Sequence, residues 1–426
     1  MIITGSINLP GDKSISHRAL MIASLSPQIS TIKNLSDGRD VQSTEYCLKL
    51  CGISIKNGPN NVKFIQGDTF SSPSKELDCG NSGTSMRLLC GLLVSKGINA
   101  TLIGDKSLSN RPMGRIIKPL FERGVDIKSI NNLAPIIIKK SALTGFKYKN
   151  KISSAQVKSA ILFSGLTATE PTYYHESILS RDHTEIMLKH FGLNIKSEEE
   201  NDGKRITFTP GNKLLAKDYD VVGDFSSAAF LIIAGLIASD SKISIKNVGL
   251  NPTRSGLIDI LIKMGGNIEI KNKNILSGEL VGDIFVESSI LKGVNISGGV
   301  IANIIDEIPV LSIAAACAEG TTRISDAHEL RVKESDRLEA ISSGLTKLKV
   351  KHELFEDGIS IDGGIPENNK VIEIDSYGDH RIAMSFLISS LKVKHSVSVD
   401  NCKNIYTSYP NFVETMNSLG LPINEQ

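Results

Sequence analysis

The sequence predicts an α/β fold made of two pseudo-threefold domains, and three observations lead to this expectation. First, 426 residues are too many for one hydrophobic core, so two domains of roughly 200 residues each are expected. Second, a helical pattern that ends in an apolar residue and usually a glycine, followed by a short β-like tail, occurs six times. Third, a helix of another type, rich in small and apolar residues, alternates with the first type.

The helices of the first type are recognised by the way they end. The copies end at residues 50–55, 123–127, 191–195, 264–268, 348–352 and 419–423, so successive copies lie about 70 to 80 residues apart. Glycine just after a helix and before β-branched residues is a C-cap that leads into a strand. Each copy is therefore expected to be a helix followed by an extended segment, although the fifth copy lacks the glycine.

The helices of the second type are expected to be buried, because their own side chains are small and apolar on every face. Their copies begin near Ser14, Gly83, Ala155, Phe225, Asp306 and Asp379. Two helices and several strands in each unit of roughly 70 residues give six units, or three for each domain. Every copy begins with a polar cluster. If the fold gathers these helix starts, their positive dipole ends create a place that attracts anions.

The first of these helix starts, at residues 9–18, reads Leu-Pro-Gly-Asp-Lys-Ser-Ile-Ser-His-Arg. The Pro-Gly turn places Asp12, Lys13 and Ser14 on the entry turn of a helix that is expected to run through Arg18 to Leu25. Free backbone N–H groups at such a turn, together with lysine, serine and arginine side chains, suit a dianion such as a phosphate monoester. The alternative is a capped surface helix with a few basic residues.

Composition excludes several classes of function. A formal charge of +2 argues against a general nucleic-acid binder. The longest apolar run, 228–238, is too short for a bilayer, and the N-terminus lacks the features of a signal peptide, so a cytoplasmic location is expected. The six cysteines are scattered without a zinc-like spacing. The motifs GxxxxGK[ST], HExxH and GxGxxG are absent from the sequence.

Basic residues gather near the expected helix starts and in the loops beside them. They are Lys13, Arg18, Arg87, Arg111, Arg181, Arg331, Lys333, Arg337 and Arg381. Each alone is an ordinary surface charge, but together they indicate substrates with several negative charges, because guanidinium groups bind carboxylate and phosphate in a bidentate way. Asp306, Glu307 and Glu334 are acid or base candidates, and Glu334 lies between cations that would hold it ionised. The alternative for such a carboxylate is a structural ion pair.

Six motifs together resemble the family of 5-enolpyruvylshikimate-3-phosphate synthases. They are Lys-Ser-Ile-Ser-His-Arg at 13–18, Gly-Asn-Ser-Gly-Thr-Ser-Met-Arg at 80–87, Arg-Pro-Met-Gly-Arg at 111–115, Ser-Ala-Gln-Val-Lys-Ser at 154–159, Arg-Val-Lys-Glu-Ser-Asp-Arg at 331–337 and Gly-Asp-His-Arg-Ile-Ala-Met at 378–384. The matches keep their order and spacing from Leu9 to Pro410, which is nearly the whole chain.

This resemblance implies a fold and an activity. Each domain would contain three βαβαββ units, in the inside-out α/β barrel typical of enolpyruvyl transferases. The domains would be residues 12–222, and 1–11 together with 223–426, with the active site in the cleft between them. The enzyme would transfer the enolpyruvyl group of phosphoenolpyruvate to the 5-hydroxyl of shikimate 3-phosphate and release phosphate, without a metal or organic cofactor. Glyphosate is a possible inhibitor, a monomer is expected, and no nucleic acid or membrane takes part.

The resemblance also assigns roles to individual residues. Lys13, Asp306 and Glu334 would be catalytic, with Asp306 at the reacting 5-hydroxyl and Glu334 as the acid that serves the methylene carbon. The residues expected to bind shikimate 3-phosphate are Lys13, Ser14, Arg18, Ser154, Gln156, Ser180, Arg181, Asp306 and Lys333. The residues expected to bind phosphoenolpyruvate are Lys13, Gly83, Thr84, Arg111, Gln156, Arg337 and Arg381.

Four positions depart from the better-known bacterial and plant pattern. Ala155 stands where a serine is usual, His183 where a tyrosine is usual, Leu88 where a proline is usual and Thr407 where a phosphoenolpyruvate-binding lysine is usual. These changes resemble the divergent bacterial branch that often tolerates glyphosate. Two other readings stay open: an enolpyruvyl transferase acting on UDP-N-acetylglucosamine, which has Lys-Asn where Lys13 and Ser14 stand, and a non-catalytic anion-binding or RNA-end-processing relative of the same repeat fold.

Overall fold

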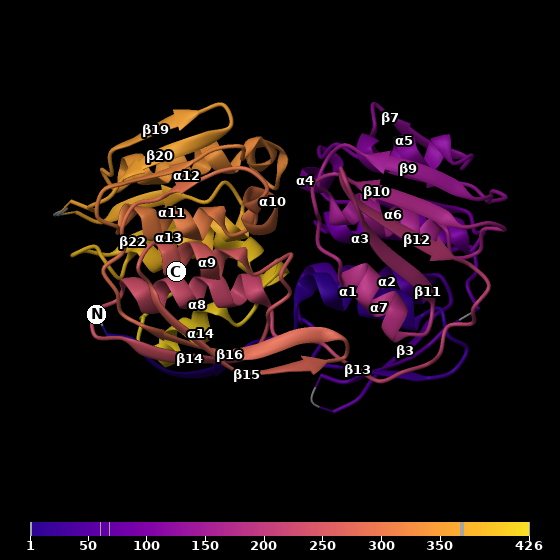
Figure 1. Cartoon of the computed structure of the whole chain (residues 1–426), viewed down its shortest axis with the longest axis horizontal. Coiled ribbons are helices and arrows are strands. Elements are labelled where there is room, and N and C mark those ends of the chain that lie inside the picture. Colours follow the sequence, from indigo (N-terminus) through magenta and orange to yellow (C-terminus); the bar gives the residue numbers. More distant parts are fainter. Residues whose placement is uncertain (1, 60, 68, 367–369, 426) are drawn as a thin grey trace. The chain divides into compact units, whose positions relative to one another are not determined.

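Successive repeats of strands and helices run along the chain in the computed structural model, which describes residues 2–59, 61–67, 69–366 and 370–425 (Figure 1). The repeats are divided between two units. The first, called the Lys13 unit below, comprises Gly11–Val221 and Leu276–Glu279. The second, the Asp306 unit, comprises the chain up to Pro10, Val222–Ile275 and the chain from Leu280 onwards.

The Lys13 unit holds three four-stranded sheets, ordered β13-β2-β4-β3, β5-β6-β8-β7 and β11-β12-β10-β9. Their strands are β2 Ser30–Lys33, β3 Ser54–Asn57, β4 Lys63–Gln66, β5 Leu77–Asp78, β6 Ala100–Ile103, β7 Ile127–Ile130, β8 Leu133–Ile138, β9 Phe146–Asn150, β10 Thr172–Glu176, β11 Asn194–Glu200, β12 Gly203–Thr209 and β13 Tyr219–Asp220. Each sheet has one parallel pair of strands, which is β13 with β2, β5 with β6, and β9 with β10. The other pairings are antiparallel. The first repeat borrows its opening strand, β13, from the end of the unit.

The Asp306 unit has the same plan. Its sheets are ordered β1-β14-β16-β15 and β17-β18-β20-β19, with a third sheet, β21-β22, of two strands among the described residues. The strands are β1 Thr4–Asn8, β14 Lys242–Gly249, β15 Asn267–Leu276, β16 Glu279–Glu287, β17 Asn295–Ile296, β18 Thr321–Ile324, β19 His352–Phe355, β20 Gly358–Asp362, β21 Ile372–Asp375 and β22 Val397–Asp400. Strand β1, from the start of the chain, pairs in parallel with β14.

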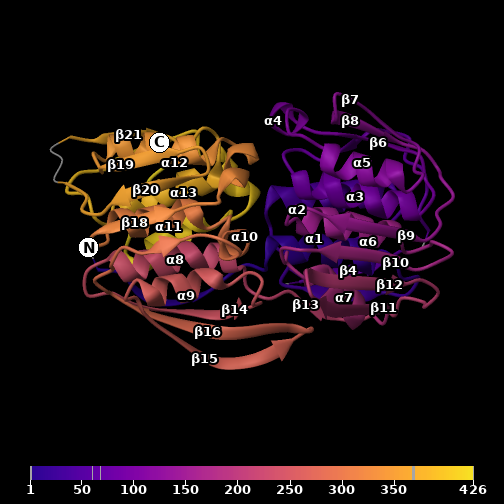
Figure 2. The same cartoon turned by 45° about the horizontal axis from the view of Figure 1, so that its top comes forward.

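Buried helices form the interior of each unit. In the Lys13 unit they are α1 Lys13–Ala23, α3 Gly83–Ser95 and α6 Ala155–Ser164, and in the Asp306 unit α8 Phe225–Ile237, α11 Ile308–Ala316 and α13 His380–Ser389 (Figure 2). All thirteen residues of α8 are buried. These helices begin at or within two residues of the expected positions. Side-chain caps explain most of these starts, because Asp12, Ser82, Ser154, Asp224 and Asp379 each accept a backbone N–H of the first turn.

The remaining helices, six of which follow the first sequence pattern, lie between the strands. They are α2 Arg39–Leu50, α4 Lys106–Ser109, α5 Gly114–Glu122, α7 His183–His190, α9 Gly256–Lys263, α10 Val300–Ile304, α12 Arg337–Lys347 and α14 Phe412–Leu419, with 3₁₀ helices η1 His328–Val332 and η2 Cys402–Thr407. The α/β fold built from repeated units is confirmed. It follows from the alternation of the two helix types with short strands.

Two local expectations differ from the structure. The β-like tail predicted after the sixth helix, at 419–423, is wrong, because residues 421–425 form no strand after the left-handed C-cap Gly420. The last sheet has two described strands, whereas each of the other five sheets has four. The first helix was expected to reach Leu25 but ends at Ala23, where Ser24 turns its hydroxyl back onto the carbonyl of Met21.

Close contact between α3 and α6 gives a test of the interior of the Lys13 unit. A Cβ added at Gly91 of α3 would lie 2.1 Å from the carbonyl oxygen of Ala160 in α6, which is backbone and cannot rotate away. We expect Gly91→Ala to destabilise the protein by about 3 kcal/mol, which exceeds the gain of roughly 1 kcal/mol in helix propensity. Thermal unfolding checks this. Gly299→Ala, where a Cβ has open space, is the control, and equal melting temperatures would contradict the close approach.

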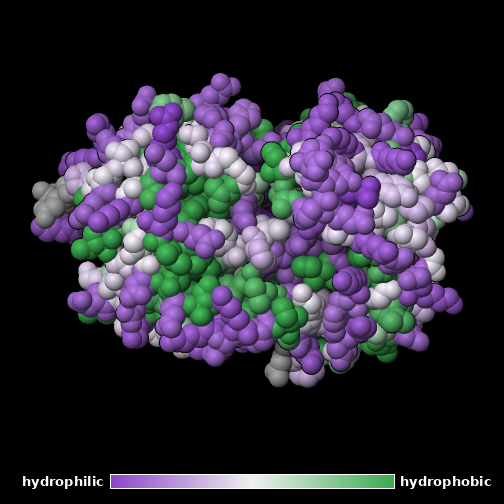
Figure 3. Space-filling view, viewed as in Figure 1, coloured by the Kyte–Doolittle hydropathy of each residue, from purple (hydrophilic) through white to green (hydrophobic). Residues whose placement is uncertain are grey.

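The surface of the units is mainly hydrophilic, with hydrophobic residues between the polar ones on the face that Figure 3 shows. Of the helices in the described part of the chain, none has both the length and the apolar character needed to cross a bilayer.

Candidate functional site

The residues singled out in the sequence fall into two groups, one in each unit, and each group is described by itself. Lys13, Ser14, Arg18, Gly83, Thr84, Arg111, Ser154, Gln156, Ser180 and Arg181 belong to the Lys13 unit. Asp306, Lys333, Glu334, Arg337 and Arg381 belong to the Asp306 unit.

In the Lys13 unit the entry turn of α1 has the expected form. The carboxylate of Asp12 caps the helix by accepting the N–H of Ile15 at 2.9 Å. Lys13 lies in the first turn, and its ammonium group donates to Asp40 of α2 at 3.0 Å. Because both side chains keep partial exposure, Lys13 is held by an ion pair and still reaches the surface. The turn therefore presents a cation beside backbone N–H groups.

Arg18, one turn further along α1, is buried and firmly oriented. Its guanidinium donates to the carbonyl of Ser14, the hydroxyl of Ser159 and the hydroxyl of Thr184, each at 2.8 Å. Burial, and next the positive charge of Arg181, lower the pKa of Arg18 to about 10, so it stays charged at neutral pH. Two guanidinium groups that repel each other in this way favour an anion nearby, which agrees with the anion-binding role expected for both.

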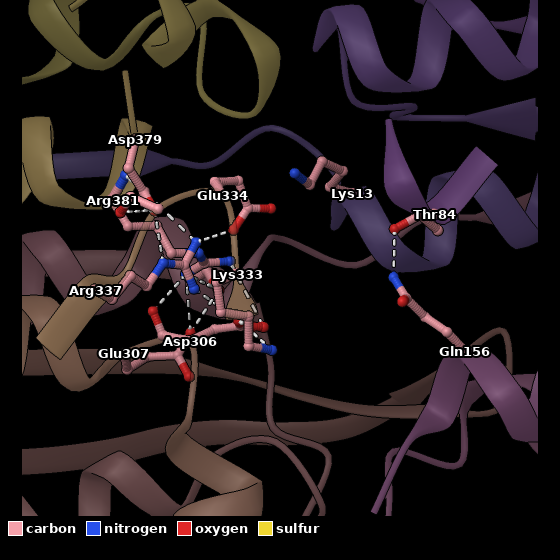
Figure 4. A network of polar contacts seen from close by, with 12 residues as sticks. Lys13, Thr84, Gln156, Asp306, Glu307, Lys333, Glu334, Arg337, Asp379 and Arg381 are labelled. Carbon is pink, nitrogen blue, oxygen red and sulfur yellow. Dashed lines mark hydrogen bonds and ion pairs between the residues drawn. The ribbon is translucent and has the colours of Figure 1, made fainter. Parts of the chain in front are cut away.

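The start of α3 meets the start of α6 through a short chain of polar contacts. Gln156 donates its amide N–H to the hydroxyl of Thr84 at 3.0 Å (Figure 4). Its amide oxygen accepts from Arg87 at 2.8 Å. Arg87 was recognised in the sequence as part of a motif, but it had not been assigned a role. Its contact with Gln156 places it in the same group as the expected phosphoenolpyruvate-binding residues.

Gly83 and Arg111 lie together at the same helix start. Arg111 is 7% exposed, and it donates to the side chain of Asn81 at 2.6 Å and to the hydroxyl of Ser107 at 3.2 Å. A Cβ on Gly83 would approach the terminal nitrogens of Arg87 and Arg111 to 3.0 and 3.6 Å. Gly83 therefore leaves space beside the guanidinium groups of Arg87 and Arg111, and a side chain at position 83 would crowd Arg87.

Ser154 and Ser180 differ in how they are held. The hydroxyl of Ser154 caps α6 by accepting the N–H of Val157 at 3.4 Å. Ser180, in the loop before α7, donates its hydroxyl to Glu176 at 2.5 Å, while its carbonyl accepts from the ammonium group of Lys158 at 3.1 Å. Neither Lys158 nor Glu176 was singled out in the sequence.

The four departures from the common family pattern have different surroundings. Leu88 is fully buried in α3, and Ala155 is the first residue of α6. His183 accepts or donates a hydrogen bond with Glu279 at 2.8 Å through Nδ1, and both side chains are buried. Thr407, in the Asp306 unit, donates its hydroxyl to the carbonyl of Asn404 at 2.6 Å, which is a contact within its own 3₁₀ helix.

In the Asp306 unit, Asp306 is surrounded by four basic groups that come from three places in the chain. Its carboxylate oxygens lie 3.3 Å from Arg337, 3.8 Å from Lys333, 3.8 Å from Arg381 and 3.9 Å from Arg254. Asp306 stands in the turn between α10 and α11, and its side chain is 15% exposed. The neighbouring Glu307 points into the interior, so only Asp306 of the pair keeps access to solvent.

Arg337 is the most deeply buried cation of this group, and it joins three carboxylates. Figure 4 shows its guanidinium between Asp379, Glu334 and Asp306. It donates to Asp379 at 2.8 Å, to Glu334 at 2.5 Å and to Asp306 at 3.3 Å. Burial opposes the charge on Arg337, but the three carboxylates outweigh burial and raise its pKa. Arg337 is therefore always charged, and it holds Glu334 and Asp306 to one side of the unit.

Arg381 is oriented by a network that the sequence analysis missed. It donates to the carbonyl of Asp306 at 2.8 Å and to the hydroxyl of Ser226 at 3.1 Å. Ser226 also accepts from Arg254 and donates to Glu307 at 2.5 Å, and Glu307 accepts from Arg254 at 3.0 Å. Ser226 and Arg254 are distant from Glu307 in the chain. The one available signal was the serine in the polar start of α8, which matched the other helix starts.

Formal charges balance within this group in the Asp306 unit. Four basic groups, Arg254, Lys333, Arg337 and Arg381, contact four carboxylates, Asp306, Glu307, Glu334 and Asp379. The arrangement provides carboxylates for proton transfer next to guanidinium groups for anion binding. An anion that binds here has to draw the guanidinium groups partly away from these carboxylates.

One further set of side chains in the described part of the chain has the spacing of metal ligands. His175 of β10 lies near Glu200 and Asp202, at 3.6 and 2.9 Å. Both carboxylates already pair with basic side chains, Asp202 with Lys149 at 2.6 Å and Glu200 with Arg205 at 2.9 Å. This set lies at the sheet β11-β12-β10-β9. It contacts none of the expected site residues in any hydrogen bond or ion pair described above.

Comparison with known proteins gives a consistent result along the whole chain. A family model described as EPSP synthase (3-phosphoshikimate 1-carboxyvinyltransferase) matches residues 2–416. A 3-phosphoshikimate 1-carboxyvinyltransferase of Ruthia magnifica is 43% identical over 425 residues, covering 99% of this chain and 97% of the relative. One from Thermoanaerobacter sp. strain X514 is 44% identical over 421 residues, covering 98% of both chains.

Solved structures agree with these relatives. An EPSP synthase from Acinetobacter baumannii superposes with a TM-score of 0.88 at 38% identity, covering 100% of this chain and 98% of that one. The enolpyruvyl transferase NikO from Streptomyces tendae gives a TM-score of 0.79 at 18% identity, covering 98% of this chain and 95% of that one. The second likeness concerns the fold.

Proposed function

The chain belongs to the EPSP synthase family, the 3-phosphoshikimate 1-carboxyvinyltransferases, and from this premise we propose how its residues carry out the reaction. It is an enolpyruvyl transferase that acts on phosphoenolpyruvate and shikimate 3-phosphate. Shikimate 3-phosphate contacts Lys13, Ser14, Arg18, Ser154, Gln156, Ser180, Arg181, Asp306 and Lys333, and phosphoenolpyruvate contacts Lys13, Gly83, Thr84, Arg111, Gln156, Arg337 and Arg381.

In the proposed addition step, Asp306 accepts the proton of the 5-hydroxyl as the hydroxyl oxygen bonds to C2 of phosphoenolpyruvate. Glu334 in its acid form delivers a proton to the methylene carbon, so C3 becomes a methyl group. In the elimination step Glu334 takes a proton back from the methyl group, the C2–O bond to phosphate breaks, and the double bond forms again. The proton that Asp306 took from the 5-hydroxyl passes to the leaving phosphate, which restores the carboxylate of Asp306.

The observation that carries this proposal is the set of cations around Asp306. Lys333 and Arg337 come from one motif and Arg381 from another, yet each lies within 3.8 Å of this one partly exposed carboxylate. Such a carboxylate can accept a proton beside an anion that the same guanidinium groups hold. An ion pair with a purely structural role would not need a partly exposed acceptor with several basic partners.

Phosphate release with alternative acceptors tests the activity. We expect phosphate to be released from phosphoenolpyruvate when shikimate 3-phosphate is the acceptor and not when UDP-N-acetylglucosamine is the acceptor. The named relatives are both 3-phosphoshikimate 1-carboxyvinyltransferases, and Ser14 stands where the transferases that act on UDP-N-acetylglucosamine have asparagine. Incubation with RNA 3′-phosphate ends, without phosphoenolpyruvate, is the third arm. Turnover of the nucleotide sugar or of RNA, in place of shikimate 3-phosphate, would refute the assignment.

Glu307 provides a prediction about the orientation of Arg381. Glu307→Gln removes the charge that holds Arg254 and Ser226, and with them one side of Arg381, at nearly constant volume. We expect KM for phosphoenolpyruvate to rise by roughly tenfold, since a buried charged hydrogen bond contributes about 1.5 to 3 kcal/mol. The exposed Glu319→Gln variant is the control, and steady-state kinetics make the comparison. An unchanged KM would mean that Arg381 does not depend on this network.

Gly83 provides a prediction about glyphosate, which we propose binds weakly in competition with phosphoenolpyruvate. A methyl group at position 83 would press on a terminal nitrogen of Arg87, 3.0 Å from the added carbon, and would stand in ordinary contact with Arg111 at 3.6 Å. We expect Gly83→Ala to raise the inhibition constant by about tenfold or more, because the methyl group takes up space beside both guanidinium groups and a displaced Arg87 binds an anion less well. Inhibition measured at several phosphoenolpyruvate concentrations checks this. An active Gly83→Ala enzyme with an unchanged inhibition constant would separate Gly83 from the inhibitor.

The cytoplasmic location and the monomeric state stay predictions. Cell fractionation and sedimentation equilibrium test them.

A further inference from the structure

A fully buried lysine stands beside the residues expected to bind shikimate 3-phosphate, and the proposed mechanism does not use it. Lys158 lies on α6 with its ammonium group 2.8 Å from Glu176, 2.8 Å from Glu185 and 3.1 Å from the carbonyl of Ser180. Burial opposes its charge, but the two carboxylates outweigh burial and raise the pKa of Lys158. An ammonium group has three N–H donors, and here three partners surround it, so its orientation is fixed.

This ion pair holds Ser180 at two points. Lys158 binds the backbone carbonyl of Ser180, and Glu176 accepts the hydroxyl of Ser180 at 2.5 Å with the carboxylate oxygen that Lys158 does not bind. Residues 177–182 form no helix or strand between β10 and α7, so no backbone ladder fixes this segment. Lys158 and Glu176 therefore hold Ser180 directly, while Ser153 supports the segment one residue earlier by donating its hydroxyl to the carbonyl of Leu179 at 3.1 Å.

The same two helices also orient Arg18. Ser159, next to Lys158 on α6, accepts from Arg18 at 2.8 Å and shares a hydrogen bond with Thr184 at 2.6 Å. Thr184 precedes Glu185 on α7 and accepts from Arg18 as well. One turn of α6 thus supports Ser180 on one side and Arg18 on the other.

Charge makes Lys158 necessary at this place. Burial raises the pKa of Glu185 even though Lys158 is beside it, which indicates how costly a charged carboxylate is here. Without Lys158, Glu176 and Glu185 would leave two buried carboxylates close to a site that has to attract an anion. The lysine therefore contributes both geometry and charge.

We propose that Lys158 is a positioning residue for shikimate 3-phosphate, because with Glu176 it fixes Ser180 and preserves the positive field around Arg18. This inference rests on the proposed function, since it uses the assignment of Ser180 and Arg18 to that substrate. Lys158 contacts no substrate and takes no part in proton transfer.

Steady-state kinetics of three variants test this role. Lys158→Met keeps the length of the side chain without the charge, and we expect KM for shikimate 3-phosphate to rise by about tenfold or more. KM for phosphoenolpyruvate should change less than about threefold. Glu176→Asp keeps the charge but shortens the side chain by one methylene, so it cannot reach both Lys158 and Ser180, and it should raise the same KM with a smaller change in melting temperature. Lys189→Met, at an exposed lysine of α7, is the control.

A charge-balanced double variant separates positioning from stability. Lys158→Met with Glu185→Gln restores the net charge of the cluster, so the melting temperature should recover while KM for shikimate 3-phosphate stays high. Recovery of that KM in the double variant would overturn the positioning role and leave Lys158 with a role in charge balance alone. An unchanged KM for shikimate 3-phosphate in the Glu176→Asp and Lys158→Met enzymes would also overturn the positioning role. If the single Lys158→Met variant does not fold, KM for shikimate 3-phosphate in the double variant and in Glu176→Asp decides between the two roles. Failure of the wild-type enzyme to turn over shikimate 3-phosphate would instead refute the proposed function.

Discussion

Replacing Asp306 by asparagine is expected to lower kcat by roughly a hundredfold or more, and Glu334→Gln should do the same, because each change removes one of the two proposed proton-transfer groups. Both substitutions keep the shape of the side chain. The amide introduced by Asp306→Asn would also leave Arg337, Lys333 and Arg381 with one carboxylate less, so affinity for phosphoenolpyruvate should not fall. KM for both substrates should therefore stay within a few-fold.

Steady-state kinetics, with single-turnover measurements to isolate chemistry, check this expectation. Glu339→Gln is the matched control, since Glu339 is an exposed carboxylate two residues beyond Arg337 on α12. If either the Asp306 or the Glu334 variant turns over at the wild-type rate, that residue is a structural ion-pair partner and the proton-transfer assignment is wrong.

Truncation of Arg381 should have the second large effect, a loss of phosphoenolpyruvate binding of about 2 to 5 kcal/mol. Loss of its guanidinium would leave a bound anion unpaired, and Ser226 and the carbonyl of Asp306 would each lose a hydrogen-bond donor. The loss for shikimate 3-phosphate should be much smaller. Arg111→Ala should show the same division between substrates, because Arg111 lies beside Gly83 in the other unit.

Separate titrations of the two ligands, with calorimetry or fluorescence, measure this division. Arg381→Lys keeps the charge but not the planar fork, so it should recover only part of the loss. Arg323→Ala, which removes an exposed arginine of β18, should leave both affinities unchanged. Equal losses for both substrates in the Arg381 variant would refute the assignment of Arg381 to phosphoenolpyruvate.

The fold was predictable where local chemistry decides it. The buried helices α3, α6 and α8 begin at Gly83, Ala155 and Phe225, as expected, because a capping side chain immediately precedes each one. The tail after α14 was mispredicted for a related reason. Gly420 does cap that helix in the left-handed conformation, but a C-cap ends a helix without deciding whether the next residues find a strand to pair with.

The candidate site was proposed from motifs more than from chemistry, and the roles of its residues stay predictions. Asp306 and Arg337 could be found because they stand in recognisable stretches. Arg254 could not, since its importance comes from Glu307, a partner far away in the chain. A usable signal did exist for Lys158, because a lysine inside a helix of small and apolar residues is seldom buried without a carboxylate partner.

The most direct test of the account is turnover of phosphoenolpyruvate and shikimate 3-phosphate in D₂O, followed by NMR of the vinyl group of the product. Addition and elimination through Glu334 pass through a methyl group that carries one solvent proton, so the product should contain deuterium in its methylene, and the little product that Glu334→Gln forms by the same route should be labelled as well. Product that forms at the normal rate with an unlabelled methylene group would contradict the central claim, because the enolpyruvyl group would then move without proton transfer to carbon.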